Sequence, residues 1–218
     1  MPSHFKPSKP AKPKVPNDSN RVRIIGGTWR SRVIAFPGAG ADGLRPTANR
    51  VRETLFNWLG QTLHGKRCLD MFSGSGALGF EAASRGAMET VMLETHPATL
   101  AALKINQQNL AATTCRVMAM DALKFIESGQ EKFDVVFVDP PFASGIMATV
   151  LKNLPDSVLP GGVVYAEWGS PIAELLDNLH ELPWEIIKQG RAGAVHFALL
   201  RTTSLSTNPI PMLAENKR

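Results

Sequence analysis

The sequence has 218 residues, enough for one domain with appendages, and its 44% hydrophobic content provides for a sizeable core. Two cysteines, Cys68 and Cys115, are too few for a disulfide framework and lack zinc-site spacing. No apolar run reaches the roughly 18–20 residues of a membrane-spanning helix, so a soluble cytoplasmic protein is predicted, without membrane contact. The net charge is +9 over residues 1–52 and −4 over the rest, which predicts a polyanionic partner for the N-terminal part.

The chain divides into a core and two polar ends. Residues 1–20 interleave prolines with lysines and hold almost no apolar residue. They cannot bury enough surface to offset the entropy of ordering, so we predict a disordered basic leader. Residues 202–218 are similarly polar and are predicted to form a flexible tail. Between them we predict an N-terminal hairpin with a linker over residues 21–46, and one domain over residues 47–201.

The segment ahead of the domain combines strand, turn and helix signals. Arg21–Ile25 and Val33–Phe36 can pair as a small hairpin around Gly26-Gly27. Thr47 is then predicted to cap a helix. The apolar positions of this helix share one face: Val51, Leu55, Trp58 and Leu59.

Apolar strand-like runs alternate with amphipathic stretches through the domain. The predicted strands are Cys68–Met71, Thr90–Glu94, Cys115–Met118, Val135–Asp139, Val163–Glu167, Trp184–Gln189 and Val195–Arg201. The predicted helices are Ala77–Arg85, Ala98–Leu110, Ala122–Ser128, Ile146–Leu154 and Ile172–Leu179. This alternation is typical of a parallel sheet covered on both faces. Only Gly190–Ala194 separates the last two strands, so the sheet is predicted to end in an antiparallel strand.

A glycine-rich loop follows the first strand of the domain. Its glycines have the G-x-G-x-x-G spacing: Gly74, Gly76 and Gly79. Between a strand and a helix, such glycines let the backbone turn tightly and approach a nucleotide. Glu94 ends the next strand, where its carboxylate can accept from both ribose hydroxyls. These features fit NAD as well as S-adenosylmethionine. Asp70, placed to meet a cationic methionine portion, and Asp121, within reach of an adenine amino group, favour S-adenosylmethionine.

The fourth strand of the domain ends in the most specific motif of the sequence, the tetrad Asp139, Pro140, Pro141 and Phe142. Ligands of open α/β sheets bind at the carboxyl ends of the strands. An aromatic exocyclic amine is a poor nucleophile, and two acceptors on its N–H groups would direct its lone pair and stabilise its growing charge. Asp139 and the Pro140 carbonyl can be these acceptors, and Phe142 offers a face on which a base stacks.

Five stretches then carry a resemblance: Arg23-Ile-Ile-Gly-Gly-Thr-Trp-Arg, Leu44-Arg-Pro-Thr, Arg50-Val-Arg-Glu-Thr-Leu-Phe-Asn-Trp-Leu, Leu69-Asp-Met-Phe-Ser-Gly-Ser-Gly-Ala-Leu-Gly and Phe137-Val-Asp-Pro-Pro-Phe. From about Arg21 to Arg201 the chain resembles the bacterial 16S ribosomal RNA guanine-N2 methyltransferases of the RsmD family. The resemblance implies the α/β class I S-adenosylmethionine methyltransferase fold. This fold is Rossmann-like, with a seven-stranded, mostly parallel sheet that has one antiparallel strand, and here an N-terminal hairpin helps to grip RNA.

The resemblance also implies a set of site residues, with the target amine at the Asp139–Phe142 tetrad. The predicted cofactor-binding residues are Asp70, Phe72, Ser73, Gly74, Gly76, Glu94 and Asp121. The predicted RNA-binding residues are Arg23, Trp29, Arg30, Arg32, Arg45, Arg50 and Arg52. Trp29 equally fits an anchor for the hairpin, and Arg50 and Arg52 also fit a solvated helix face. The implied partner is ribosomal RNA, naked or within a small-subunit particle.

Other functions remain consistent with these motifs. Similar tetrads serve adenine N6, so a DNA or RNA adenine methyltransferase is one alternative, and a non-catalytic RNA-binding factor with this fold is another. A dehydrogenase would require NADH binding. No histidine has a partner at ligand spacing, so no metal site is predicted. No heptad pattern calls for a dimer, and we expect a monomer.

Overall fold

The computed structural model describes residues 21–37, 47–141, 145–178 and 181–203. The strands are β1 (Arg21–Arg23), β2 (Val33–Ala35), β3 (Arg67–Asp70), β4 (Glu89–Glu94), β5 (Cys115–Ala119), β6 (Phe133–Val138), β7 (Val158–Trp168), β8 (Trp184–Ala192) and β9 (Val195–Thr202). The helices are α1 (Asn49–Trp58), α2 (Ala77–Ser84), α3 (Pro97–Asn109), α4 (Ala122–Glu127), α5 (Met147–Asn153) and α6 (Ile172–Asp177). Among these helices, none is long and apolar enough to cross a membrane.

Seven strands form the central sheet in the order β5-β4-β3-β6-β7-β9-β8. All neighbouring strands from β5 to β7 are parallel, whereas β9 runs antiparallel to both β7 and β8. This confirms the predicted mostly parallel sheet with one antiparallel strand, β9. The sheet does not end in this strand, because β9 lies between β7 and β8 and β8 forms the edge. The strand order reverses direction between β3 and β6, and at such a point an open α/β sheet forms its ligand crevice.

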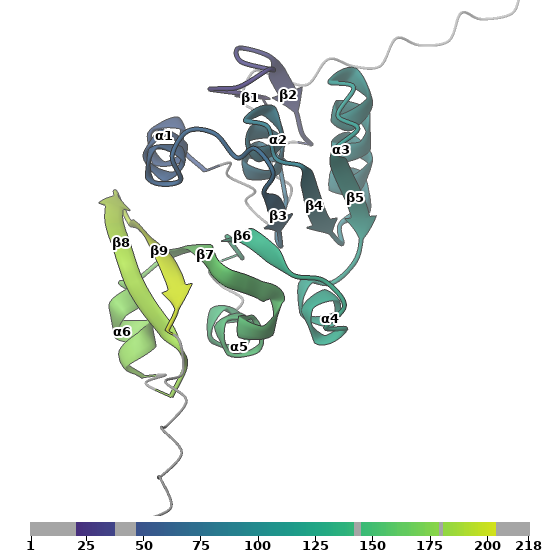
Figure 1. Ribbon diagram of the computed structural model, residues 1–218. Helices are drawn as coiled ribbons and strands as arrows, with labels where there is room; N and C mark the ends of the chain where they lie inside the picture. Colours follow the sequence, from purple (N-terminus) through teal and green to yellow (C-terminus); the bar gives the residue numbers. More distant parts are fainter. Residues whose placement is uncertain (1–20, 38–46, 142–144, 179–180, 204–218) are drawn as a thin grey trace, which may run out of the picture.

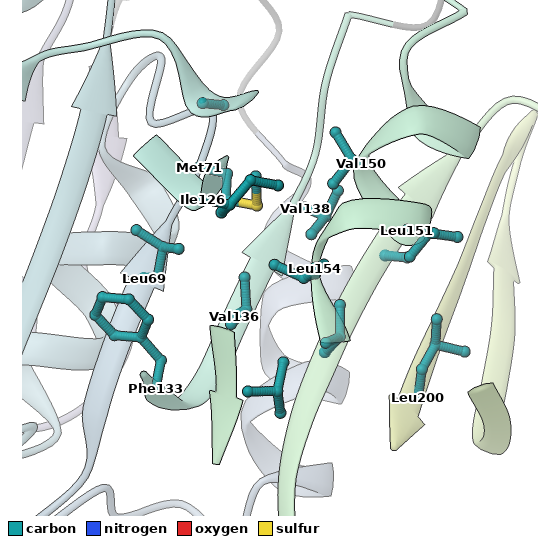
Figure 2. Packing of buried hydrophobic residues seen from close by; sticks show 14 of the residues in the cluster. Leu69, Met71, Ile126, Phe133, Val136, Val138, Val150, Leu151, Leu154 and Leu200 are labelled. Carbon is teal, nitrogen blue, oxygen red and sulfur yellow. The ribbon is translucent and has the colours of Figure 1, made fainter. Parts of the chain in front are cut away.

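Helices cover both faces of the sheet, with α1, α2 and α3 on one side and α4, α5 and α6 on the other (Figure 1). On the second side, the apolar residues of β3, β6 and β7 pack against α4 and α5. Figure 2 shows this layer, in which Val136 and Val138 of β6 lie among Ile126, Val150 and Leu154. Because adjacent residues of a strand face opposite sides, the apolar runs of the sequence fill both layers.

In the central sheet, the predicted strand bounds agree with the structure to within one residue except at three strands. β6 begins at Phe133 rather than Val135, β8 extends to Ala192 rather than Gln189, and β7 begins at Val158 rather than Val163. The sequence Pro160-Gly161-Gly162 signals a break, and it lies inside the strand. The pairing with β6 shifts register there, from Phe133–Val158 to Val135–Val163, so an irregularity accommodates the extra residues. A prediction from local residue types therefore places the strand start too late.

The N-terminal hairpin pairs Arg21–Arg23 with Val33–Ala35 in antiparallel register, as predicted, and its turn lies against α2 (Figure 1). The buried Glu81 carboxylate accepts hydrogen bonds from the backbone N–H groups of Ile25 and Gly26, both at 2.8 Å. Gly27 has a φ of +75°, and a Cβ there would lie 1.8 Å from the Ser84 carbonyl oxygen. Glycine is therefore required at this close approach.

Candidate active site

The glycine loop connects β3 to α2 at the carboxyl edge of the sheet. Gly76 precedes the helix with a φ of +80°, and a Cβ on it would approach side-chain atoms of Leu103 and Phe80 to 2.7 Å. A Cβ on Gly79 would meet Met92 of β4 at 2.8 Å. The first glycines thus shape the turn, and the third lets the helix pack closely on the sheet.

Hydrogen bonds from Ser73 tie the loop to the strands β3 and β4. The Ser73 backbone N–H donates to the Leu93 carbonyl at 3.0 Å, and its hydroxyl donates to the Asp70 carbonyl at 3.1 Å. Phe72 is half-buried and packs against the core beneath α4 and α5. Ser73 and Phe72 therefore shape the loop that would border a nucleotide.

Asp70 ends β3 with its side chain buried beneath the loop, only 2% exposed. Its Oδ2 accepts from the Gly79 N–H at 2.9 Å, which fixes the carboxyl group against the first turn of α2. The pKa of Asp70 is raised to about 7. Burial is the main cause and the nearby Glu94 carboxylate adds to it, whereas hydrogen bonds from the Gly79 and Phe72 N–H groups act in the opposite direction. A cation beside Asp70 would favour its ionised form.

Glu94 ends β4 with its carboxylate turned toward the glycine loop. Its Oε2 accepts from the Gly74 N–H at 3.1 Å, and its Oε1 accepts from the N–H groups of Thr95 at 2.8 Å and His96 at 2.7 Å. A carboxylate has about four lone-pair positions, so backbone groups use most of this one. Glu94 therefore ties the loop to the strand end, in addition to the ribose contact predicted for it.

Asp121 follows β5 and caps α4, because its Oδ1 accepts from the Lys124 N–H at 3.0 Å. This leaves its second carboxylate oxygen without a protein hydrogen bond among the described residues. Asp70, Glu94 and Asp121 thus stand at the ends of three adjacent strands, β3, β4 and β5, along one edge of the sheet.

Asp139 follows β6 directly and is half-buried. Its Oδ2 accepts a hydrogen bond from the Thr47 hydroxyl at 3.1 Å. The prediction that Thr47 caps α1 is wrong, since Ala48 occupies the cap position without a side-chain hydrogen bond. Burial raises the pKa of Asp139 well above its usual value, with a further rise from the Glu167 carboxyl, while the Thr47 hydrogen bond lowers it. Pro140 is buried, and Phe142 lies outside the described residues.

Glu167 lies beside Asp139, near the end of β7. The register pairs Val138 with Ala166, so Asp139 and Glu167 follow as neighbours on adjacent parallel strands. Glu167 is 5% exposed and accepts from the Tyr165 hydroxyl at 2.7 Å. Burial raises the pKa of Glu167, and that hydrogen bond lowers it. No ion pair balances Asp70, Asp139 or Glu167 within the part of the chain that the structure describes.

A family model described as "Conserved hypothetical protein 95" matches residues 22–201. The Escherichia coli strain K12 protein named "Ribosomal RNA small subunit methyltransferase D" is 38% identical over 192 residues, which cover 85% of this chain and 93% of the relative. The chain belongs to this family. The Haemophilus influenzae member is 37% identical over 85% of this chain and 96% of its own. A solved Escherichia coli structure, 36% identical, superposes with a TM-score of 0.72 over 84% of this chain and 98% of that one.

The family and the fold make the chain a methyltransferase with S-adenosylmethionine as its cofactor, and the site fits that molecule. S-adenosylmethionine carries a sulfonium and an ammonium cation next to a nucleoside. Within the described residues, no ion pair neutralises the acids at the strand ends, so a cationic ligand could balance them. The glycine loop packs so closely that a Cβ on Gly76 or Gly79 would clash with neighbouring side chains, which fixes the path of the loop beside these acids. Asp70 and the loop would hold the methionine portion, with Glu94 and Asp121 toward the nucleoside.

The predicted RNA-binding residues of this chain occupy different environments. Arg23, Arg30, Arg32 and Arg50 are exposed, and Arg45 lies outside the described residues. Arg32 also donates to the Asn109 carbonyl at the end of α3. Trp29 is half-buried and packs on the cluster beneath the hairpin, which favours its alternative role as an anchor. The exposed arginines therefore remain the predicted RNA contacts.

The prediction that Arg52 contacts RNA needs correction. Its side chain is 0% exposed and forms an ion pair with Glu81 at 3.3 Å. It also donates to the Arg23 carbonyl at 2.9 Å and to the Asn49 side chain at 2.7 Å. A guanidinium enclosed in this way cannot reach RNA. The local sequence could not separate it from Arg50, because the partner that buries it comes 29 residues later.

Glu81 and Tyr165 were not singled out from the sequence, whereas Glu167, which ends a predicted strand, equally fits an acid at the edge of the site and a structural acceptor. Glu81 is the single charged residue in α2, and an acid in so apolar a helix is a signal of a buried partner. Tyr165 and Glu167 stand two residues apart on a strand, which places both side chains on one face. The hydrogen bond between Thr47 and Asp139 joins residues 92 positions apart, and no local pattern indicates it.

Proposed function

We propose that the protein transfers a methyl group from S-adenosylmethionine to the exocyclic N2 amine of a guanine in 16S ribosomal RNA. The names of the relatives support small-subunit ribosomal RNA as the substrate class. The main support for an exocyclic amine as the methylated group is the Asp139 carboxyl. One of its oxygens is fixed by Thr47, and the other makes no hydrogen bond to the described protein, so it is available to a target N–H.

The residues around the target would act on nitrogen rather than on carbon. Asp139 accepts one amine N–H, and the Pro140 carbonyl, which follows it directly, accepts the other. Together they orient the lone pair and stabilise the charge that develops on nitrogen. S-adenosylmethionine, when bound, would supply the methyl group of its sulfonium and be left as the neutral thioether S-adenosylhomocysteine. The nitrogen would release one proton to water as the N-methyl product forms. Cys68 and Cys115 are buried, and burial raises both thiol pKa values to about 12, which opposes a thiolate mechanism at carbon.

A basic hollow offers RNA a route to Asp139. A cavity of about 420 Å³ lies between the hairpin and the start of α1, lined by Arg21, Arg23, Thr47 and Asn49 among others. Because Thr47 also contacts Asp139, a nucleotide in this hollow would lie next to the target acid. The two arginines would meet phosphates, which fix register rather than sequence.

The product decides the assignment. Small-subunit particles and naked 16S RNA from cells that lack this gene are incubated with the protein and labelled cofactor, and the digested nucleosides are separated by mass. We expect N2-methylguanosine with the intact protein and far less label with the Asp139→Ala variant. N6-methyladenosine would replace the guanine proposal with the adenine alternative. The absence of any methylated nucleoside on both substrates would contradict catalysis on this RNA.

A further inference from the structure

Three elements outside the tetrad surround the Asp139 carboxyl. Thr47, just ahead of α1, donates to Oδ2 at 3.1 Å. Glu167 lies alongside on β7, one residue beyond the registered pair Val138–Ala166. Asp70, at the end of β3, is the remaining charged group close enough to influence Asp139. Asp139 thus has one neutral donor and two acids as neighbours, and no cation among the residues that the structure describes.

Glu167 is held where it is by a buried partner. The Tyr165 hydroxyl donates to its Oε2 at 2.7 Å, and both side chains are buried, at 0% and 5% exposure. The alternation of a strand directs Tyr165 and Glu167 to the same face, which α1 covers. Glu167 therefore cannot turn away from Asp139 into solvent, and its carboxyl group remains a fixed neighbour.

We propose that Thr47 and Glu167 are positioning residues that act on Asp139 in opposite directions: the Thr47 hydroxyl favours and aims the ionised carboxylate, whereas the Glu167 carboxyl favours its neutral form. Neither residue needs to touch the substrate. The consequence for turnover rests on the proposed function, because an ionised Asp139 is the acceptor for the target amine. The influence on the carboxyl itself does not depend on which base is methylated.

The electrostatics of the site agree with this arrangement. Burial is the main cause that raises the pKa of Asp139, followed by Glu167, while the Thr47 hydrogen bond lowers it and Asp70 raises it slightly. Since the raised pKa leaves Asp139 neutral on the acid side, activity should fall as the pH decreases through that value. A cationic cofactor and an amine that gains charge would both shift the group back toward the carboxylate.

The test compares two isosteric variants. Single-turnover methylation at saturating cofactor and RNA is measured from pH 5 to pH 9. Thr47→Val removes the hydrogen-bond donor, so the acidic limb of the pH–rate profile should move up by about one pH unit. Glu167→Gln removes the second acid, so the same limb should move down by about one unit. Thr47→Ser keeps the hydroxyl and should follow the wild type. Limbs that do not move, or that move in the same direction, overturn the proposal.

A second measurement is independent of the reaction. The free protein is labelled with ¹³C at the aspartate carboxyl carbons, and the Asp139 signal, assigned by its loss in Asp139→Asn, is titrated by NMR. The midpoint should rise in Thr47→Val and fall in Glu167→Gln, even if the methylated base is not guanine. Equal midpoints in all three proteins overturn the proposal. If Thr47→Val does not fold, Glu167→Gln alone decides, because an unchanged or raised midpoint contradicts the role of Glu167.

Discussion

Two groups of buried charged side chains lie near α2, and they differ in whether their acids are paired with cations. Beneath the hairpin, Glu81 has two arginine partners, Arg52 at 3.3 Å and Arg85 at 2.9 Å. At the strand ends, Asp70, Asp139 and Glu167 lie close together, and no cation pairs with them in the described chain. Burial penalises both groups, but only the first contains its own compensation.

The difference separates a structural role from a binding role. The Glu81 carboxylate accepts four hydrogen bonds, from two arginines and from two backbone N–H groups of the hairpin. In such a network, folding itself supplies the hydrogen bonds and the opposite charges that the buried carboxylate needs. A cluster of acids whose pKa values are raised by burial and mutual repulsion is neutralised either by bound protons or by a positively charged ligand. The unbalanced acids therefore indicate where a cationic cofactor and an amine that gains charge would bind.

The largest expected effect comes from breaking the balanced group. Glu81→Ala leaves Arg52 and Arg85 buried without their anion and removes the acceptor for the hairpin turn. We expect a loss of about 3–5 kcal/mol in the free energy of unfolding, the range for breaking a buried ion pair. Urea unfolding measures it, and Glu127→Ala, at an exposed glutamate of α4, is the control and should change little. Equal stability of the two variants would contradict the structural role of Glu81.

Breaking the unbalanced group at Asp139 should affect catalysis rather than folding. Its interaction with the target amine strengthens as charge appears on nitrogen, so it matters most in the transition state. Asp139→Ala should lower the single-turnover rate by roughly 10²–10³, with cofactor affinity close to that of the wild type. Asp139→Asn keeps one acceptor oxygen and should retain more activity than Ala. Near-normal rates in Asp139→Ala would mean that the tetrad only ends the strand and has no catalytic role.

Removing Glu94 should weaken the cofactor site. Glu94→Ala removes the predicted ribose acceptor and also the carboxylate that ties the glycine loop to β4. We expect S-adenosylmethionine binding to weaken by roughly 2–3 kcal/mol, measured by calorimetry. Glu89→Ala, at the opposite end of the same strand, is the matched control and should leave the affinity unchanged. An unchanged affinity in Glu94→Ala would remove this residue from the site.

The mildest test titrates Asp70. Its folded-state pKa of about 7 exceeds its ordinary value of 3.8, so the folded protein binds more protons than the unfolded chain between these values. Stability from Asp70 is therefore present at low pH and is lost as the pH rises toward 7. Asp70→Asn should be about as stable as the wild type at pH 4 and more stable at pH 8, with the difference growing between pH 4 and pH 7 and levelling off above pH 7. Urea unfolding across that range checks it, and a constant difference would exclude titration of Asp70 as the cause.

The sequence predicts the sheet well because its signals are local. Each apolar run lies between turn residues, and the short connection before Val195 leaves no room for a helix, so the order of the strands along the chain and the antiparallel strand β9 follow. The glycine loop and the tetrad are also contiguous, and their place at strand ends gives their side chains a common edge. What these motifs share is that no distant residue is needed to interpret them.

The environment of those motifs depends on distant residues and was not predictable in the same way. Thr47 precedes a helix, and a capping hydroxyl and a hydroxyl bonded to Asp139 look identical in sequence. Arg50 and Arg52 lie in one short basic segment, yet Arg50 is exposed, whereas Arg52 is buried and paired with Glu81. In each case, packing of residues far apart in the chain decides which of two local options is adopted.

The shortness of α2 limits how the parts of this protein can be exchanged. The helix extends for eight residues, about 12 Å. One end supplies the Gly79 N–H to Asp70, and the other end supplies Glu81 and Ser84 to the hairpin turn. A chimera that takes its hairpin from another family member would need the matching α2 with it. The segment that would select the substrate and the segment that shapes the cofactor loop should therefore be inherited together.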